Sequence, residues 1–495
     1  EGWYIPSQQG CGLVLTIDAE IQEMVEKAMR ECIEVNQAQS VICLVSDVKT
    51  GAILAMCMNP CYDPNDPPRN DAETLTELMR LTAISDVYEP GSTFKILTAA
   101  SALDSGVTTP QDSFYCSAKI TVDGDTIRCW GRPHGAETMA DGLKNSCNPV
   151  FVELALRMGT DTFYRYLTAF GLGKKTGIDL PGESPGILIT SRNVKRVDLA
   201  RIGFGQSVAL TPIQMMMAAN SVINGGKLMK PYIVSEIQTP DGETLERFHP
   251  TVMAAPIRPE TSDTMRLLLE RVVSEGGGKN AAIAGYRIGG KTGTAQVYKN
   301  GRVVRDTHIG SFYGFAPVND PQVSILVIVK EADVPIDYGG TTAAPFARQI
   351  MQEMLPYLGI DPENDEKDEE IEVPALKGLT IGDAKRKLSQ VGLESVTDGA
   401  NTVVLDQLPP AGAKLVKGGH VMLYTAGSEE LTPEELVCVP DLTGLGDVDC
   451  ARLVRQRGLM MSMTGQGLCT EQSPAAGEYV QPGTTIFLLM AGDDE

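Results

Sequence analysis

The order of apolar and polar positions in the N-terminal 360 residues predicts an alternation of strands and helices. The stretch VLTIDAEIQEMVEKAMRECIEV, from Val14, predicts a strand tip, an N-cap at Asp18 and an amphipathic helix. The stretch SVICLVSDVKTGAILAMCMNP, from Ser40, predicts two apolar strands joined by a turn at residues 47–51. RIGGKTGTAQV, SFYGFAPV and QVSILVIVKEA, between residues 287 and 332, predict neighbouring strands. Strands at both ends, with helices between them, indicate an α+β fold whose sheet joins distant parts of the chain.

The C-terminal region repeats itself. VPALKGLTIGDAKRKLSQVGL starts at Val373, and VPDLTGLGDVDCARLVRQRGL starts 66 residues later at Val439. In both copies apolar residues spaced i, i+4 predict a helix that a glycine ends, and a turn and a β-rich segment follow. The residues concerned are Ala384, Leu388 and Gly392 in the first copy and Cys450, Val454 and Gly458 in the second. We interpret each copy as one helix on a small sheet, and both resemble PASTA domains.

An acidic stretch separates the two regions. Residues 361–372 (DPENDEKDEEIE) hold eight acids and one lysine, and such a run cannot bury apolar area. We therefore predict a solvated linker there. The predicted division is a large domain over residues 1–360, a linker over 361–371, a repeat domain over 372–427, a second linker over 428–437 and a second repeat domain over 438–492.

Composition narrows the possible partners and compartments. The 495 residues carry a formal net charge of −22, which argues against nucleic acid or an anionic membrane surface as the main partner. No run of 18 apolar residues is present, and the chain opens at Glu1, so we expect a piece of a longer protein with an anchor upstream. The 11 cysteines form no paired C-x-x-C units. A zinc site is therefore not expected, and so many unpatterned cysteines indicate reducing surroundings.

The first candidate for chemistry is Ser92-Thr-Phe-Lys95, which follows a Pro-Gly turn and opens a predicted helix. Ser92 and Lys95 are i and i+3 and share one face of that helix. A hydroxyl is a poor nucleophile unless a base takes its proton, and a lysine is a base only when burial or a nearby cation lowers its pKa. The alternative is a helix start with a capping serine and a solvated lysine, which is the usual meaning of an isolated S-x-x-K.

A second S-x-x-K in the chain serves as a comparison. Ser46 to Lys49 lies where a strand passes into a turn, and residues three apart on a strand point to opposite faces. We assign these two residues no catalytic role.

The next candidate is Ser146-Cys-Asn148, an S-x-N on a predicted loop between helices. Ser146 could relay a proton there and Asn148 could hold a substrate amide. Cys147 between them leaves a thiol nucleophile open, although none of the four histidines stands near it in sequence, and a small packing residue is the simpler interpretation.

The third candidate is Lys291-Thr292-Gly293-Thr294, one of three K-T-G occurrences. The copies at residues 49–51 and 175–177 lie in a hairpin turn and a loop-rich stretch, whereas this copy has strand character and flanking glycines. On an edge strand it could pair with an extended peptide, with Lys291 holding a carboxylate and the two threonines donating hydrogen bonds. For a K-T-G considered alone, the alternative is an ordinary hairpin whose lysine is solvated.

The three motifs occur in the order S-x-x-K, S-x-N and K-T-G, separated by 54 and 145 residues. This ordered set is typical of penicillin-binding proteins and class A β-lactamases. Further stretches resemble class B penicillin-binding proteins, and the match covers residues 11–356; the two repeats that resemble PASTA domains point to the Gram-positive branch of that family. The stretches are LTIDAEIQ, KTGAILAMCMNPCYDPN, FGLGKKTGIDLPGE, GFGQSVALTPIQMMMAANSVINGG and YGGTTAAPFA.

The resemblance implies a fold and a mechanism. The fold would be that of penicillin-binding transpeptidases and serine β-lactamases, with a central antiparallel sheet flanked by helices and two PASTA domains after it. Ser92, Lys95 and Ser146 would be catalytic, the backbone N–H groups of Ser92 and Thr294 would form the oxyanion hole, and the substrate would be bound by Asn148, Lys291, Thr292, Gly293 and Thr294. No metal or cofactor is expected.

The partners that the resemblance implies are peptidoglycan stem peptides, β-lactam antibiotics bound covalently at Ser92, and a glycosyltransferase or other division partner. The protein would act on the outer face of the cell membrane, in division or sporulation. Two alternatives stay open: a related hydrolase, either a β-lactamase or a D,D-carboxypeptidase, with Glu183 as a weak deacylating candidate, and a non-catalytic wall-binding sensor module.

Overall fold

The protein is described here from a computed structural model. The structure describes residues 10–131, 133–299, 302–334, 337–362, 370–398, 403–416, 418–424 and 437–446, and beyond these residues 450, 451, 453, 454, 457, 459–465, 467–474, 476, 479, 480 and 484–491. Two compact units are present, Glu1–Ala426 and Gly427–Glu495. Residues 363–369 and 428–436, which make up most of the two predicted linkers, lie outside the described residues, while residues 370 and 371 of the first linker and residue 437 of the second belong to short strands.

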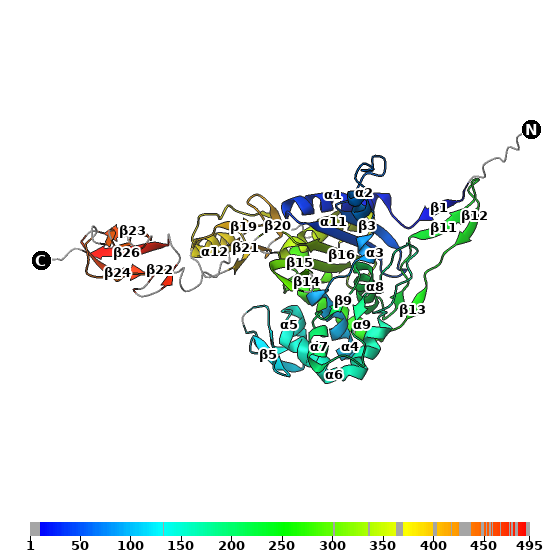
Figure 1. Ribbon diagram of the computed structural model, residues 1–495, viewed down its shortest axis with the longest axis horizontal. Coiled ribbons are helices and arrows are strands. Elements are labelled where there is room, and N and C mark those ends of the chain that lie inside the picture. Colours follow the sequence, from blue (N-terminus) through cyan, green and yellow to red (C-terminus); the bar gives the residue numbers. More distant parts are fainter. Residues whose placement is uncertain are drawn as a thin grey trace, which may run out of the picture. The chain divides into compact units, whose positions relative to one another are not determined.

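The centre of the first unit is a five-stranded antiparallel sheet (Figure 1). Its order is β14–β15–β16–β2–β3, so the strands nearest the two ends of this region of the chain lie side by side. The predicted joining of distant segments in one sheet is thus confirmed. The strands are β2 (Ser40–Asp47), β3 (Ile53–Asn59), β14 (Gly289–Lys299), β15 (Arg302–Ala316) and β16 (Val323–Lys330).

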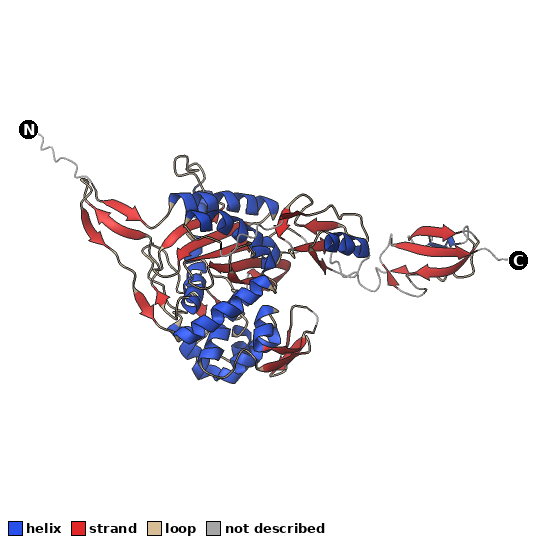
Figure 2. Cartoon of the chain, turned by 180° about the vertical axis from the view of Figure 1, so that it is seen from behind, coloured by secondary structure: helices blue, strands red, loops and turns tan. Residues whose placement is uncertain are grey.

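Helices cover both faces of this sheet (Figure 2). The helices α1 (Ala19–Val35) and α11 (Ala344–Tyr357) pack on the face that carries Val41, Cys43 and Val45. The other face carries Ile42 and Leu44 and is buried with a larger helical core. Its helices are α4 (Lys95–Asp104), α6 (Asn148–Ala169), α8 (Pro212–Ile223) and α9 (Pro259–Ser274). Alternation along β2 therefore supplies both cores, because neighbouring side chains on a strand point to opposite faces.

The remaining elements of this region are short and frame the helices and the sheet. They are β1 (Gly12–Leu15), α2 (Ala72–Leu78), α3 (Thr82–Ser85), η1 (Gly91–Phe94), β4 (Ser113–Cys116), β5 (Lys119–Val122), β6 (Asp125–Arg128), β7 (Gly135–Thr138), α5 (Met139–Lys144), β8 (Ile187–Leu188), α7 (Arg196–Ile202), β9 (Val208–Ala209), β10 (Leu228–Met229), β11 (Val234–Gln238), β12 (Thr244–Arg247), β13 (Val252–Ala254), η2 (Lys279–Ala281) and α10 (Gly339–Thr342).

Local signals in the sequence explain where the elements begin. The Asp18 carboxylate accepts hydrogen bonds from the backbone N–H groups of Glu20 and Ile21, so it caps α1 as predicted. The turn between β2 and β3 is held by Asp47, whose carboxylate accepts from the N–H groups of Lys49 and Thr50.

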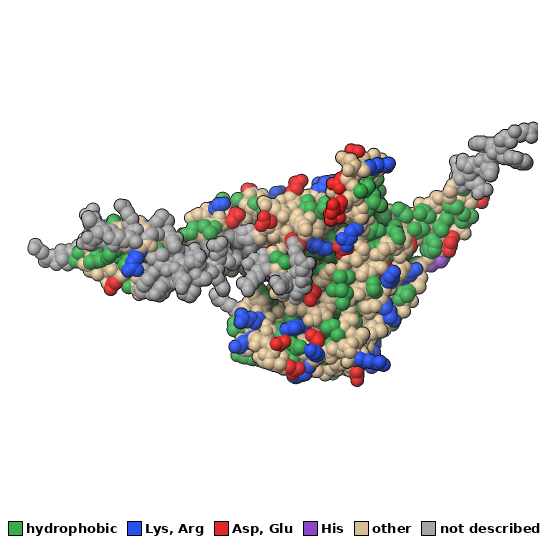
Figure 3. All heavy atoms as spheres, viewed as in Figure 1, with side chains coloured by type: hydrophobic (Ala, Val, Ile, Leu, Met, Phe, Trp, Pro, Cys, Tyr) green, Lys and Arg blue, Asp and Glu red, His purple; other side chains and the backbone are tan. Residues whose placement is uncertain are grey.

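An arm formed by β1, β11 and β12 carries several exposed apolar side chains (Figure 3). They include Leu13, Leu15 and Leu245. Among the residues that the structure describes, we find no helix with both the length and the apolar character needed to cross a bilayer.

The two repeats have the same small sheet. In the first, β18 (Glu394–Asp398) and β19 (Asp406–Leu408) flank β21 (His420–Tyr424), and α12 (Ile381–Gln390) buries Ala384 and Leu388 on the repeat's core. Gly392 follows the helix with φ +82°, which fits its predicted role as a helix stop.

The second repeat has the corresponding order, with β23 (Met460–Gly465) and β24 (Leu468–Ser473) on either side of β26 (Thr485–Ala491). Cys450 and Val454 are buried in its core as predicted, while Gly458 lies outside the described residues. The short strands are β17 (Glu370–Glu372) and β20 (Lys414–Val416) in the first repeat and β22 (Val437–Cys438) and β25 (Tyr479–Val480) in the second.

Candidate active site

The segment that carries Ser92 is packed tightly against the edge of the sheet. Gly91 adopts φ +53°, and a Cβ there would lie 2.5 Å from the carbonyl oxygen of Thr294 on β14. A side chain at this position would therefore force η1 away from the strand. The Gly91 N–H donates to the Gly205 carbonyl at 3.0 Å, which holds the turn from the other side. Ser92 is left partly exposed, one turn before Lys95.

Lys95 begins α4 and is wholly buried. Its Nζ donates to the Ser146 carbonyl oxygen at 2.6 Å, to the Ser146 Oγ at 3.2 Å and to the Asn148 Oδ1 at 2.7 Å. It also lies 5.3 Å from the centre of the Phe151 ring. The first two predicted motifs, 54 residues apart in sequence, therefore meet through this amine.

Burial changes the acid–base chemistry of Lys95. Removal of the ammonium from water lowers the pKa of Lys95 to about 7, and the partial compensation by Cys129, Cys147 and Glu137 is smaller. Its three hydrogen-bond acceptors are a carbonyl, a hydroxyl and an amide oxygen, and none of them is ionised. Near neutral pH a large share of Lys95 is therefore the free amine, which is the form that can accept a proton.

Ser146 lies between α5 and α6, as predicted, with φ +56°. Its Oγ accepts a hydrogen bond from the Nζ of Lys291 at 3.0 Å as well as from Lys95. Burial lowers the pKa of Lys291, and so does the neighbouring charge of Lys95. The hydroxyl of Ser146 thus joins two lysines whose pKa values are both lowered, an arrangement suited to passing a proton.

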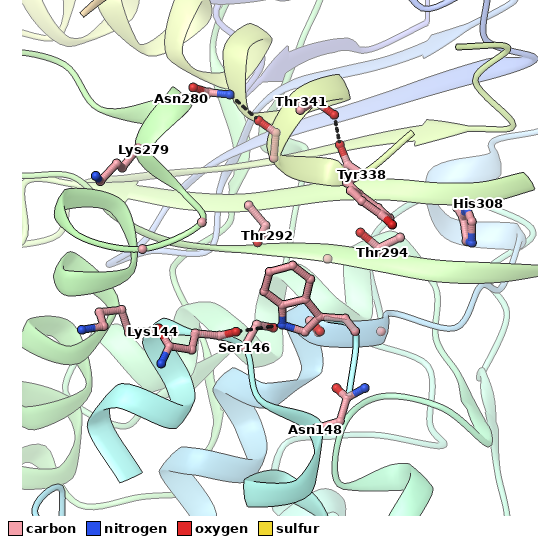
Figure 4. Close-up of a pocket in the computed structure, with 18 of the residues that line it drawn as sticks. Lys144, Ser146, Asn148, Lys279, Asn280, Thr292, Thr294, His308, Tyr338 and Thr341 are labelled. Atoms are coloured by element: carbon pink, nitrogen blue, oxygen red, sulfur yellow. Dashed lines mark hydrogen bonds between the residues drawn. The ribbon is translucent and has the colours of Figure 1, made fainter. Parts of the chain in front are cut away.

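The K-T-G motif lies on β14, the edge strand that was predicted for it. Thr292, Gly293 and Thr294 line a cleft of about 700 Å³, together with Ser92, Ser146 and Asn148. Figure 4 shows Ser146 and Asn148 facing the strand that carries Thr292 and Thr294. The structure therefore brings all the predicted site residues to one place: six line the cleft, and the two buried lysines bond to Ser146 behind it.

Several cleft residues were missed by the sequence analysis. Trp130 lines the cleft, and its Nε1 donates to the Asn145 carbonyl at 2.9 Å. His308 and Tyr338 line it too. Trp130 is one of two tryptophans in the chain and is exposed in the structure. The rarity of tryptophan could have drawn attention to this residue as a binding residue, but no spacing rule connects it to the three motifs.

The alternative motif copies lie elsewhere. The Ser46 hydroxyl is buried between Ser324 and Asn220, while Lys49 is exposed and pairs with Asp320 at 2.7 Å. The residues of this S-x-x-K thus point in different directions, as expected.

The remaining candidates from the sequence are also accounted for. The Glu183 carboxylate accepts from the N–H groups of Thr176 and Gly177, so it fastens the loop that holds the K-T-G at residues 175–177. Cys147 is fully buried and is absent from the residues that line the cleft, which argues against a thiol nucleophile at this site.

Comparison with known proteins agrees with this architecture. The family model described as "Penicillin binding protein transpeptidase domain" matches residues 41–352. The model of the PASTA domain matches residues 371–427 and 437–492. The chain belongs to the penicillin-binding protein transpeptidase family. Its transpeptidase domain, PASTA repeats and relatives make it a class B penicillin-binding protein.

Named relatives of this penicillin-binding protein come from several bacteria. Stage V sporulation protein D of Bacillus subtilis is 38% identical over 438 residues, which cover 86% of this chain and 67% of that protein. The peptidoglycan D,D-transpeptidase FtsI of Escherichia coli is 30% identical over 358 residues, 72% of this chain and 58% of that protein. The chain thus spans about three fifths to two thirds of these relatives.

A solved structure shares the fold. Penicillin-binding protein 3 of Mycobacterium tuberculosis, in complex with aztreonam, superposes with a TM-score of 0.66 at 28% identity, over 71% of this chain and 80% of that one. The predicted fold class is thereby confirmed.

Proposed function

We propose that this chain is a serine D,D-transpeptidase that cross-links peptidoglycan stem peptides through an acyl-enzyme on Ser92. The observation that carries the proposal is the meeting of Lys95, Ser146 and Lys291 directly behind a cleft that Ser92 lines. Relatives named stage V sporulation protein D and peptidoglycan D,D-transpeptidase support it.

In the first half-reaction the Ser92 Oγ attacks the carbonyl carbon of the penultimate D-Ala of a stem peptide. Neutral Lys95 takes the hydroxyl proton, and the oxyanion is stabilised by the backbone N–H groups of Ser92 and Thr294. The C–N bond to the terminal D-Ala then breaks. The departing amine receives a proton through Ser146, which the Lys95 and Lys291 amines both contact.

In the second half-reaction an amine of another stem peptide attacks the ester on Ser92. A new amide bond forms, and the bond between the acyl carbon and the Ser92 Oγ breaks. The proton of the attacking amine returns through Lys95 to the Ser92 Oγ. Asn148 orients the acyl group, and Thr292 and Thr294 bind the stem peptide along β14, since an edge strand has free backbone groups for an extended peptide.

Location and domain limits follow from the same proposal. The enzyme would act on the outer face of the cell membrane, held by an upstream segment, with residues 1–360 as catalytic domain and residues 372–427 and 438–492 as PASTA domains. The family matches support these limits. β-Lactams would acylate Ser92, and a glycosyltransferase of the division or sporulation machinery would be the partner.

Intact-mass spectrometry after treatment with benzylpenicillin, followed by peptide mapping, tests the proposal. We expect one adduct on Ser92, none on Ser92→Ala, and an unchanged adduct on the matched control Ser46→Ala from the second S-x-x-K. An adduct that persists on Ser92→Ala would overturn the nucleophile. An adduct lost within seconds would instead indicate a β-lactamase, and release of D-Ala from a stem pentapeptide without cross-linking a carboxypeptidase.

A further inference from the structure

A cluster of three cysteines and one histidine includes the middle residue of the S-x-N motif and has no role in the reaction proposed above. The sulfur atoms of Cys116, Cys129 and Cys147 and a ring nitrogen of His134 all lie within 4.8 Å of one another. The Cys129 Sγ is 3.8 Å from the Nδ1 of His134 and 4.0 Å from the Cys147 Sγ. Four soft ligand atoms thus share one small volume.

The four residues come from separate short elements. Cys116 ends β4, Cys129 follows β6, His134 precedes β7, and Cys147 is the N-cap of α6. No two of them are spaced as C-x-x-C, and for that reason a zinc site was not expected from the sequence. The antiparallel pair β4–β7 and the β5–β6 hairpin, which lies between these two strands in the chain, carry Cys116 and Cys129 to the start of α6, and that arrangement is not visible in sequence spacing.

The geometry fits a tetrahedral zinc ion. With Zn–S of about 2.3 Å and Zn–N of about 2.0 Å, ligand atoms around a tetrahedral zinc are separated by about 3.5 to 3.8 Å. The separations of 3.8 and 4.0 Å between these ligand atoms already lie within a few tenths of an ångström of that range. The largest separation, at most 4.8 Å, requires a contraction of about one ångström, which side-chain rotation can supply.

The surroundings favour a cation as well. Cys116 and Cys147 are fully buried, and the side chain of His134 is 17% exposed. Beside them the buried Glu137 Oε1 has no hydrogen-bond partner and lies 3.8 Å from the His134 Nδ1. A buried carboxylate oxygen left without a partner is costly, and a cation bound beside it would offset that cost.

We propose that Cys116, Cys129, His134 and Cys147 form a structural Zn²⁺ site. All four coordination positions come from side chains of this chain, so no open position remains for water or substrate, which is the mark of a structural rather than a catalytic zinc. The ion would fasten both strand pairs to the start of α6. Since Cys147 lies between Ser146 and Asn148, it would also hold the two residues that contact Lys95.

A disulfide is the competing use of these thiols. A Cys129–Cys147 bond would need its sulfur atoms at about 2.05 Å, roughly 2 Å closer than they lie. Such a bond would use neither Cys116 nor His134, although both lie in the same cluster. The two states differ in the number of free thiols, because zinc preserves all 11 and a disulfide removes two.

The decisive experiment is elemental analysis of the full chain, purified without a histidine tag and dialysed against metal-free buffer. We expect one zinc per chain in the wild type and in Cys61→Ser, a matched control at an exposed cysteine far from the cluster in sequence. Cys129→Ser and His134→Ala should lose the metal. Zinc below one tenth of stoichiometry in the wild type, or content that these variants leave unchanged, overturns the proposal.

Measurements on the wild type alone cover the case in which a variant does not fold. A chelator should lower the melting temperature, and added Zn²⁺ but not Mg²⁺ should restore it. Co²⁺ in place of zinc should give the visible absorption of a tetrahedral thiolate site. Thiol titration in denaturant with chelator and no reductant should find 11 thiols; two fewer would establish the disulfide instead. None of these readouts depends on transpeptidase activity.

Discussion

The pH dependence of acylation tests the role given to Lys95 most directly. If the free amine takes the proton of Ser92, the rate follows the neutral fraction of Lys95. With its pKa lowered to about 7 by burial, that fraction rises from about 9% at pH 6 to about 50% at pH 7 and about 91% at pH 8. We therefore expect a rise of about tenfold between pH 6 and pH 8 and a plateau above.

An unperturbed lysine would behave differently. With the ordinary value of 10.5, the neutral fraction would rise about 100-fold over the same interval and would continue to rise beyond pH 9. The sign follows from the cause: burial disfavours the ammonium, so the base becomes available at lower pH. The groups that oppose this are Cys129, Cys147 and Glu137, and their smaller effect leaves the net shift downward.

The assay is stopped-flow acylation by a fluorescent penicillin from pH 5.5 to 9.5 at constant ionic strength, with circular dichroism at each pH to confirm folding. The control variant is Lys49→Ala, which removes the lysine of the other S-x-x-K; its exposed pair with Asp320 contributes little, so profile and stability should be unchanged. A wild-type profile that is flat, or that climbs without a plateau beyond pH 9, would refute Lys95 as the base.

Three further changes have expected outcomes. Ser146→Ala removes the hydroxyl between the two lysines and should slow acylation about 100-fold, measured by the same stopped-flow assay, while the melting temperature changes little. Asn220→Ala removes one hydrogen bond from each of the buried hydroxyls of Ser46 and Tyr313, although Ser46 keeps Ser324 as a partner, and should lower the free energy of unfolding by about 2 kcal/mol in a urea titration; a loss below about 0.5 kcal/mol would contradict this. Asp18→Ala removes the cap of α1 and should lower the free energy of unfolding by about 1 kcal/mol in the same urea titration, whereas Asp18→Asn should retain most of the capping stabilisation.

Much of the fold could be predicted because its signals are local. The N-cap at Asp18, the turn after β2 and the alternation along β2 each depend on residues within a few positions of one another. The site residues could be predicted for another reason: the three motifs occur in a known order, and that order stands for a spatial arrangement no single motif reveals. The edge position of β14 could be inferred only from its glycines and its strand character.

Contacts between segments without a motif could not be predicted. Trp130 reaches the cleft through a turn whose position is set by the pairing of β5 with β6. The grouping of Cys116, Cys129 and Cys147 has a similar origin, because the packing of two strand pairs on the start of α6, and not spacing along the chain, brings their sulfur atoms together. The sequence therefore predicted which motif residues meet at the cleft but not the structure beside it.

The position of β14 at the end of the sheet also affects how this protein behaves in concentrated solution. An unpaired edge is a template on which a second molecule could add its own strand, and self-association of this kind leads to aggregates. Here the middle of that edge lies along a cleft whose lining includes Trp130 and Tyr338, so a single narrow chain can approach it more easily than another folded sheet. The recess that accommodates a slender ligand would thus also discourage one molecule from joining another.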